Sequence, residues 1–324
     1  MTALWIILGI IFGLAIIFFG ILLFCYLMAF YVPRRTKRHL EKYKMPPGKV
    51  YLQYEDVLIP AMKKVRSMPC KKVEIKSFDN LTLRGRYFET KKGAPVELML
   101  HGYRGNSETD LSVGVLRAQT LGHNVLLVDH RAAGYSDGNT ITFGAKESKD
   151  CLFWVDFLIN KLGKDVKIFM TGISMGAATV MIAAGSESLP KSVIGVVADC
   201  GYTSAEEIIK KVIKQMRLPV KIFYPLVNLS AKLFGNFNIK DASPIKAMKK
   251  CTLPIVFFHT ETDTFVPAEM SRRNYEACAS NKKHLYVSKS GEHGMCFIAD
   301  KKGYISAIKK LEKDCGINNK KEEK

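Results

Sequence analysis

The sequence predicts an α/β fold built on a mixed, mostly parallel β-sheet and preceded by one transmembrane helix. An uncharged apolar stretch opens the chain, and short apolar runs alternate with helix-length stretches after Pro95. Two alternating runs also flank an Asp79-Asn80 turn. Alternating strands and helices indicate a parallel sheet covered on both faces, and the turn indicates an antiparallel hairpin at one end of that sheet.

The strands and helices are expected in a regular order along the chain. The hairpin is expected first, from Val73 through Phe78 and from Leu81 to Phe88. The further strands are expected at residues 96–100, 125–128, 166–170, 193–198, 255–258 and 285–287. Helices are expected between them at residues 108–121, 146–162, 177–184, 268–279 and 301–310.

The interval from Asp199 to Pro254 is too long for a simple connection. Its pattern predicts two extra helices, near residues 205–216 and 220–234, within a small cap insertion of about 203–245. One interpretation is a helix pair packed on its own small core. The other is a lid over the active site, whose apolar underside lines the substrate pocket. The two interpretations are compatible.

Residues 3–32 carry no charged side chain and are long enough to cross a bilayer. Trp5 near one end, and Tyr26, Phe30 and Tyr31 near the other, are expected at the two membrane interfaces, and Pro33 ends the helix. A cleavable signal peptide would need basic residues before a shorter apolar run and a small-x-small cleavage site. The sequence therefore predicts an uncleaved anchor.

A basic connector, residues 33–70, follows the anchor, and residues 50–65 within it resemble a short helix near the membrane surface. Arg34, Arg35, Lys37 and Arg38 directly after the span place the rest of the chain in the cytoplasm by the positive-inside rule. A single-pass protein of the cell membrane is expected. Leu23-Phe24-Cys25 lacks the small residue that usually precedes a lipidated cysteine.

The chain is strongly basic, with 49 Lys and Arg against 30 Asp and Glu and a net charge of +19. The basic residues are scattered and no nucleic-acid-binding motif accompanies them, so nucleic acid is not an expected partner. An anionic membrane leaflet is an expected partner, because it attracts basic residues. The eight cysteines contain no Cys-x-x-Cys pair, which indicates free thiols in a reducing compartment and no metal site.

Gly172-Ile173-Ser174-Met175-Gly176 lies between an apolar strand and a helix of small residues. Gly-x-Ser-x-Gly is common by itself, but this position makes it specific, because a sharp strand-to-helix turn needs glycines on both sides of a crowded serine. Ser174 is therefore the predicted nucleophile. The backbone N–H of Met175 is a predicted donor to the oxyanion.

Ser174 needs a base, and the base needs a carboxylate that orients it. His293, in a loop after the last predicted strand, is the expected base, and Asp263, after a strand end, is the expected acid. Glu261 and Asp199 are the competing carboxylates. The other histidines are assigned either to strand ends as structural residues (His101, His130, His259) or to solvent (His39, His123, His284).

A second oxyanion donor is expected in the loop His101-Gly102-Tyr103-Arg104-Gly105-Asn106. Within this loop, the backbone N–H of Tyr103 is the predicted donor. An ordinary Gly-rich turn is the alternative interpretation of this segment.

Several motifs in this order resemble those of the α/β-hydrolase superfamily: 101–106, 129–136, the Ser174 turn, 263–267 and 291–294. They are most similar to its serine-aminopeptidase or prolyl-oligopeptidase-like branch. The resemblance covers residues 71 to about 312, leaving 313–324 as a charged tail, and it implies acyl hydrolysis through an acyl-enzyme without cofactor or metal. Thr260 and Asn80 stand where the family often has glycine, which affects loop shape more than chemistry.

Hydrolysis of a carboxylic ester or lipid acyl ester at the membrane is the leading expectation, motivated by the anchor, the positive charge and the apolar insertion. Two alternatives stay open. A membrane-bound serine peptidase or aminopeptidase would use the same chemistry, and a membrane adaptor without catalysis would use only the fold.

Overall fold

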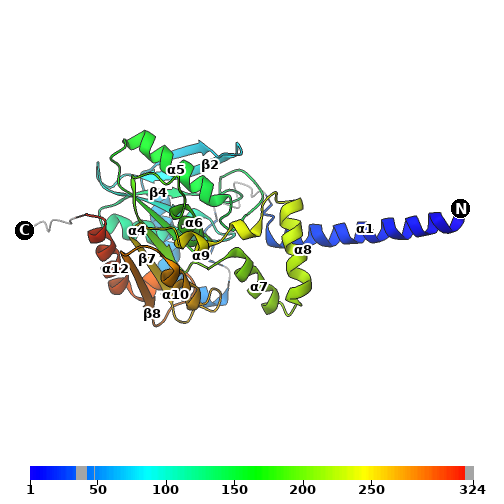
Figure 1. The fold of residues 1–324 in the computed structure, drawn as a ribbon. Helices are drawn as coiled ribbons and strands as arrows, with labels where there is room; N and C mark the ends of the chain where they lie inside the picture. Colours follow the sequence, from blue (N-terminus) through cyan, green and yellow to red (C-terminus); the bar gives the residue numbers. More distant parts are fainter. Residues whose placement is uncertain (34–41, 47, 318–324) are drawn as a thin grey trace, which may run out of the picture.

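The computed structural model describes residues 1–33, 42–46 and 48–317, and its centre is an eight-stranded sheet (Figure 1). The order across the sheet is β1-β2-β4-β3-β5-β6-β7-β8. The strands are β1 (Lys71–Lys76), β2 (Thr82–Phe88), β3 (Val96–Leu100), β4 (Asn124–Val128), β5 (Ile168–Ile173), β6 (Val193–Asp199), β7 (Ile255–Thr260) and β8 (Lys283–Ser288). β1, β2 and β4 pair antiparallel and all remaining pairs are parallel.

The predicted helices are present between these strands, which confirms the predicted α/β-hydrolase fold. The helices are α1 (Thr2–Ala29), α3 (Glu55–Ser67), α4 (Ser107–Thr120), α5 (Glu147–Leu162), α6 (Met175–Ala184), α7 (Ala205–Gln215), α8 (Val220–Leu233), α9 (Pro244–Met248), α10 (Ala268–Ala277), α11 (Cys296–Ala299) and α12 (Lys301–Asp314). The short helices α9 and α11 were not predicted. Short 3-10 helices lie at η1 (Lys49–Tyr54) and η2 (Ile239–Asp241).

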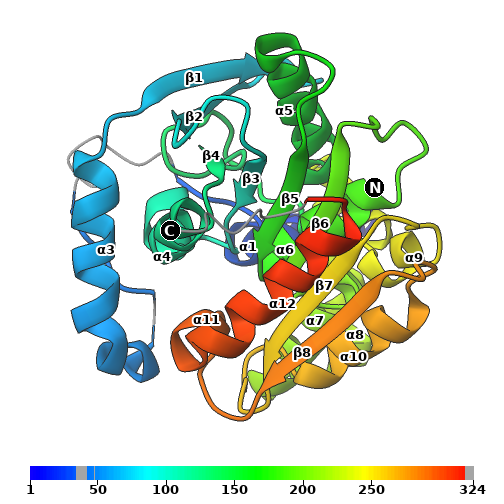
Figure 2. The same cartoon turned by 90° about the vertical axis from the view of Figure 1, so that its left-hand side faces the viewer.

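The two faces of the sheet bury alternate side chains of each strand, as the period of two requires. Leu98 and Leu126 pack with α5, α6 and α9, whereas Met99 and Leu127 pack with α4 on the opposite face. The helix α12 covers the same face as α4, farther along the sheet (Figure 2). Both faces are therefore covered, which explains why the central strands are continuous apolar runs in the sequence.

The predicted hairpin is present, with β1 and β2 in register from Lys71–Tyr87 to Lys76–Thr82. Asn80 in its turn has φ 67°, a left-handed conformation that asparagine tolerates better than most residues other than glycine. This explains how the chain forms the turn without the glycine that the family often has there.

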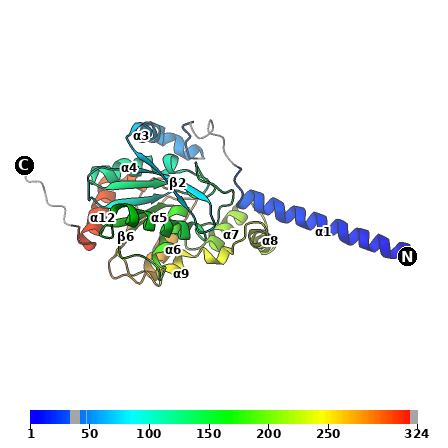
Figure 3. The same ribbon diagram turned by 90° about the horizontal axis from the view of Figure 1, so that it is seen from above.

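The carboxyl ends of the parallel strands meet at one edge of the sheet, at Leu100, Ile173, Asp199 and Thr260. The helices α7 and α8, which form the predicted insertion, lie beyond this edge together with α1 (Figure 1 and Figure 3). Residues that follow these strands are thereby enclosed between the sheet and the insertion.

The N-terminal helix α1 has the length and mean hydropathy of a membrane span, and most of it projects away from the domain (Figure 1). Its last turns do not. Leu22, Tyr26 and Phe30 are buried, and the two aromatic rings belong to a cluster shared with α7 and α8. The expectation that Tyr26 and Phe30 lie at a lipid interface is therefore wrong, because the insertion covers both rings.

Part of the predicted connector folds onto the domain. The helix α3 buries Leu58, Met62 and Val65, and Arg66 forms an ion pair with Glu108 of α4. The expected helix is therefore present as η1 and α3 and packs on the domain, while its place near a membrane surface stays a prediction. Arg34, Arg35, Lys37, Arg38 and His39, and most of the charged tail, lie outside the described residues.

The helix α6 starts so close to β3 that position 176 has no room for a side chain. A Cβ built on Gly176 would overlap the carbonyl oxygen of Leu100, and one on Gly172 would overlap the carbonyl oxygen of Gly176. Gly114 in α4, by contrast, has space, with the sulfur of Met99 at 3.9 Å from a built Cβ.

We expect Gly176→Ala to lower the free energy of unfolding by at least about 2 kcal/mol, because backbone must move to admit the methyl group. Gly114→Ala is the matched control and should be neutral or stabilising by up to about 1 kcal/mol, since alanine favours a helix. Thermal unfolding of the two variants in detergent measures the difference. Equal stability of both would contradict the steric argument.

Candidate active site

The turn at Ser174 joins β5 to α6 in a backbone conformation that few residues adopt. Ser174 has φ 55° and ψ −115°, and its N–H donates to the carbonyl oxygen of Asp199 at 2.8 Å. Residues are held in such conformations only where the surrounding structure enforces them, and here the glycines at 172 and 176 permit the crowding. The hydroxyl is thereby lifted above the carboxyl edge of the sheet.

The structure brings Ser174, His293 and Asp263 together. His293 Nε2 lies 2.8 Å from Ser174 Oγ, and His293 Nδ1 lies 2.6 Å from Asp263 Oδ2. Because the Asp263 carboxylate accepts a hydrogen bond, Nδ1 carries the proton and Nε2 is left to accept from the serine hydroxyl. The three residues come from turns after β5, β7 and β8.

The carboxylate of Asp263 is held by backbone N–H groups and by His259 as well as by His293. Its Oδ1 accepts from the N–H groups of Phe265 and Val266 at 2.8 Å each, and its Oδ2 lies 3.2 Å from Nε2 of the buried His259. Burial raises the pKa of Asp263, but hydrogen bonds from His259 and His293 outweigh burial and hold that pKa well below its ordinary value. The carboxylate is therefore ionised throughout the neutral range.

The loop that carries His293 is held from three sides. Thr262 Oγ1 donates to the carbonyl oxygen of Gly291 at 2.6 Å, and the Phe265 ring packs edge-on against the imidazole at 5.2 Å. Tyr51 in η1 donates to the His293 carbonyl oxygen at 3.1 Å. Sequence reasoning missed Tyr51, because nothing local to the connector indicates that it contacts this loop.

The loop expected to supply the second oxyanion donor lies against the nucleophile. A Cβ built on Gly102 would be 3.5 Å from Ser174 Cβ. The Gly102 N–H donates to Asp110 Oδ2 of α4 at 2.9 Å, and His101 Nδ1 donates to the Gly102 carbonyl oxygen at 2.8 Å. Tyr103 follows Gly102 directly and Met175 follows Ser174, while the roles of their N–H groups as donors stay a prediction. Asp110 was not foreseen from the sequence.

The same loop also holds the end of α1. Tyr103 Oη donates to the carbonyl oxygen of Ala29 at 2.7 Å. The guanidinium of Arg104 donates to the carbonyl oxygens of Met28 at 2.8 Å and Tyr31 at 3.2 Å. The last carbonyls of a helix have no partner within the helix, and a cation is favoured at that end. The end of α1 is thereby joined directly to the site.

Cys200 is a further residue at the site that sequence reasoning missed. Its sulfur lies 3.9 Å from His293 Nε2, and its backbone has φ 48°. Cys200, Asp263 and His293 offer ligand atoms within 4.8 Å of one another, the spacing of a metal site. Burial raises the pKa of the Cys200 thiol well above its ordinary value, and His293 already bonds Asp263 and Ser174, so the cluster is better suited to proton transfer than to metal binding.

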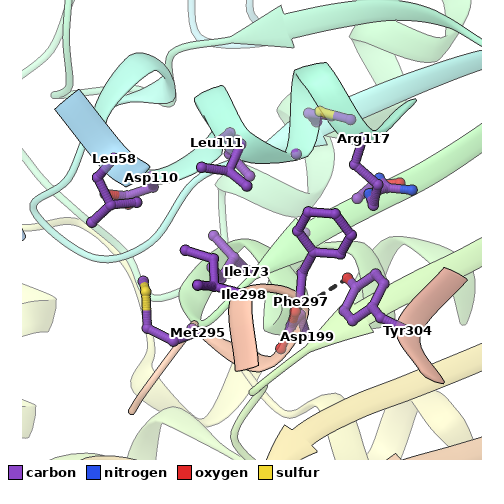
Figure 4. A pocket seen from close by; sticks show the side chains of 16 residues that line it. Leu58, Asp110, Leu111, Arg117, Ile173, Asp199, Met295, Phe297, Ile298 and Tyr304 are labelled. Carbon is purple, nitrogen blue, oxygen red and sulfur yellow. Dashed lines mark hydrogen bonds between the residues drawn. The ribbon is translucent and has the colours of Figure 1, made fainter. Parts of the chain in front are cut away.

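The competing carboxylates are engaged elsewhere. Glu261 forms an ion pair with Arg272 at 2.6 Å. Asp199 lines a cavity of about 50 Å³ behind the Ser174 turn, where it accepts from Tyr304 Oη at 3.1 Å (Figure 4). Burial raises the pKa of Asp199 to about 6, despite His259, Tyr304 and other groups that lower it.

The remaining histidines in the described part of the chain are structural. His101 Nε2 accepts from the His130 N–H at 3.1 Å. The expectation that His284 is solvated is wrong, because it lies within β8 and pairs with Asp314. The expectation that His123 is solvated is wrong, because its side chain is buried between Glu97 and Glu312. Burial lowers the pKa of His123, but hydrogen bonds to Glu312 and Glu97 outweigh burial and raise that pKa to about 9.

The raised pKa of Asp199 gives a pH-dependent stability. An unfolded aspartate has a pKa of about 3.9, so ionisation of Asp199 costs folding free energy as pH rises from about 4 through 6. We expect Asp199→Asn to be more stable than the wild type by about 2–3 kcal/mol at pH 8, with a smaller difference at pH 5. Thermal unfolding across this range measures it.

Glu261→Gln is the matched control, since it neutralises a more exposed carboxylate and should change stability by less than about 0.5 kcal/mol at any of these pH values. A gain in Asp199→Asn that stays constant with pH would contradict the assignment.

Comparison with known proteins supports the fold. Residues 98–228 match the family model described as alpha/beta hydrolase fold. The chain is 30% identical over 192 residues to the uncharacterized protein YqkD of Bacillus subtilis, covering 59% of this chain and 62% of that protein. It is 26% identical over 194 residues to lysophosphatidylserine lipase ABHD12 of Danio rerio, covering 58% and 48%. Both matches span less than two thirds of the relative's own length.

Among solved structures, the Pyrococcus furiosus esterase Pf2001 superposes with a TM-score of 0.61 at 24% identity, covering 77% of this chain and 94% of the esterase. At this identity the likeness concerns the fold alone. The chain therefore has the α/β-hydrolase fold, and its resemblance to the serine-aminopeptidase or prolyl-oligopeptidase-like branch stays a prediction.

Proposed function

We propose that this protein is a membrane-anchored serine hydrolase that cleaves carboxylic esters or lipid acyl esters. The observation that carries the proposal is the unbroken hydrogen-bonded line from Ser174 Oγ through His293 to Asp263, with links of 2.8 and 2.6 Å. Nucleophilic catalysis needs a base within hydrogen-bond reach and a group that orients the base, and this line supplies both.

In the proposed reaction His293 takes the hydroxyl proton as Ser174 Oγ attacks the ester carbonyl carbon. The oxyanion accepts hydrogen bonds from the N–H groups of Met175 and Tyr103, each such donor being worth about 3 kcal/mol. His293 then protonates the departing alcohol, which leaves an acyl group on Ser174. Water, deprotonated by His293, releases the acid and restores the hydroxyl. Asp263 stabilises the imidazolium in both steps.

The anchor is part of this proposal. A signal peptide is removed from the mature protein, whereas the last turns of α1 pack under the insertion and bond to Tyr103 and Arg104 beside the nucleophile. Cleavage would remove Cys25 and Tyr26 of α1, which are buried in the cluster shared with the insertion. These contacts favour an uncleaved helix, and the basic residues after it favour a cytoplasmic domain.

The proposed substrate class is inferred from the position of the insertion over the site and from its apolar side chains. The insertion that lies over the carboxyl edge of the sheet buries a cluster that includes Met175, Ile209 and Val227. An acyl chain delivered from a bilayer suits such surroundings better than a charged peptide terminus does. The names of the esterase Pf2001 and of the lipase ABHD12 agree with acyl-ester cleavage.

We expect a fluorophosphonate probe to label the full-length protein in detergent and to fail on Ser174→Ala. Asp263→Asn should slow labelling by about 10³-fold or more, because His293 then loses the acceptor that fixes its tautomer. Gel fluorescence of labelled protein measures both. Ser188→Ala, which changes an exposed serine after α6, is the matched control and should label like the wild type. Undiminished labelling of Ser174→Ala would contradict the proposal.

A substrate panel separates ester hydrolysis from the peptidase alternative. We expect turnover of monoacylglycerols, lysophospholipids or p-nitrophenyl esters of medium-chain acids, and little turnover of aminoacyl p-nitroanilides. Ser174→Ala serves as the blank for each substrate. Preferential cleavage of aminoacyl amides would assign the protein to the peptidases instead.

A further inference from the structure

The outer face of the insertion helix α8 is apolar and exposed. Val227, Ser230 and Ala231 point into the domain, whereas Ile222, Leu229 and Leu233 are 60%, 36% and 52% exposed. Exposed leucines and isoleucines gathered on one helix face indicate a surface that meets something apolar. Lys221 and Lys232 are exposed beside them, as on helices that lie in a membrane interface.

The segment that carries this face is strongly basic, although Glu206 of α7 lies beside it and pairs with Lys210. Between residues 208 and 240 the chain has seven Lys and Arg residues and no Asp or Glu. Such a segment is attracted to an anionic lipid surface, where each well-placed basic residue contributes about 1 kcal/mol. An acidic protein surface would match the charge, but it would not match the apolar centre of the face.

The helix α1 sets the height of this face relative to a bilayer. Side chains are exposed throughout residues 2–21 apart from Gly13, and burial against the insertion begins at Leu22. The free part of the helix is about 30 Å long, which is the thickness of the hydrocarbon core. The insertion therefore begins where the bilayer core would end.

The joint between α1 and α8 is packed. Phe234 directly after α8 contacts Phe19 at 6.3 Å and Tyr26 at 5.7 Å between ring centroids. The end of α1 is also bonded to Tyr103 and Arg104. Figure 1 shows α8 running across the direction of α1, and Figure 3 shows it end-on beside α1. If α1 crosses a bilayer, α8 must lie along the surface of that bilayer.

We propose that α8 is a membrane-surface helix whose face of Ile222, Leu229 and Leu233 sits at the boundary of lipid headgroups and acyl chains, with Lys221 and Lys232 reaching anionic headgroups. This inference rests on the anchor of the proposed function and deepens it. The outer side of the insertion over Ser174 would then contact lipid. An acyl substrate could therefore pass from the bilayer to the site without crossing water.

The test uses tryptophan fluorescence of the full-length protein in nanodiscs. Trp5 lies in α1 and is exposed, so both variants carry Trp5→Phe, and the buried Trp154 gives the same background in each. Leu229→Trp reports on α8. Leu162→Trp is the matched control, because Leu162 is similarly exposed at 40% and ends α5 just before β5 begins, at the sheet edge opposite Ser174.

In nanodiscs whose lipids carry bromine near the headgroup end of the acyl chain, we expect the Leu229→Trp protein to lose about half of the emission of the added tryptophan, and Leu162→Trp to lose little. Anionic lipid should increase the loss. Leu233→Trp gives a second reporter on the same face, should Leu229→Trp fail to fold.

Equal, weak quenching at positions 229 and 162 overturns the inference. Blue-shifted emission from the tryptophan added by Leu229→Trp, without bromine quenching, also overturns it, because a second copy or another protein then covers the face. Fluorophosphonate labelling of Ser174 in the same samples keeps the two proposals apart. Labelling without quenching would support the hydrolase proposal and reject the lipid contact of α8. Quenching without labelling would support the lipid contact and reject the hydrolase proposal.

Discussion

The backbone of Ser174 is held at φ 55° and ψ −115°, and the arrangement of the site depends on this one strained turn. The strain persists because β5 and α6 are anchored independently in the sheet and in its covering layer, and because no side chain at 172 or 176 competes for the space. With the turn in place, the hydroxyl stands where loops from two neighbouring strands can reach it. His293 and Asp263 then need only short loops to complete the hydrogen-bonded line.

The second organising feature is the junction between α1 and the loop 101–106. Tyr103 and Arg104 hold the last carbonyls of α1 while Gly102 packs against Ser174. The loop is thus shared between the N-terminal helix and the nucleophile. A displacement of α1 would alter the position of the Tyr103 N–H, so under the proposed function membrane attachment and acyl transfer depend on the same few residues.

The fold could be predicted because alternating strands and helices leave local periodic signals, and Ser174 because its motif is local. His293 and Asp263 could be placed by chain order after particular strands. Tyr51 and Cys200 could not, since their contacts join segments distant in sequence, and no local pattern marks a connector residue that reaches across the domain. His123 was misjudged for the same reason: two glutamates from other elements bury its charge, and the residues next to it do not reveal them.

The most direct test of the central claim is to trap the covalent intermediate. A p-nitrophenyl carbamate transfers a group that leaves a serine only slowly, so the modified protein can be digested and analysed by mass spectrometry. The account predicts one carbamoyl group per chain, on Ser174, with an equal amount of p-nitrophenol released. Modification of Cys200 instead, or none in folded protein, would contradict it.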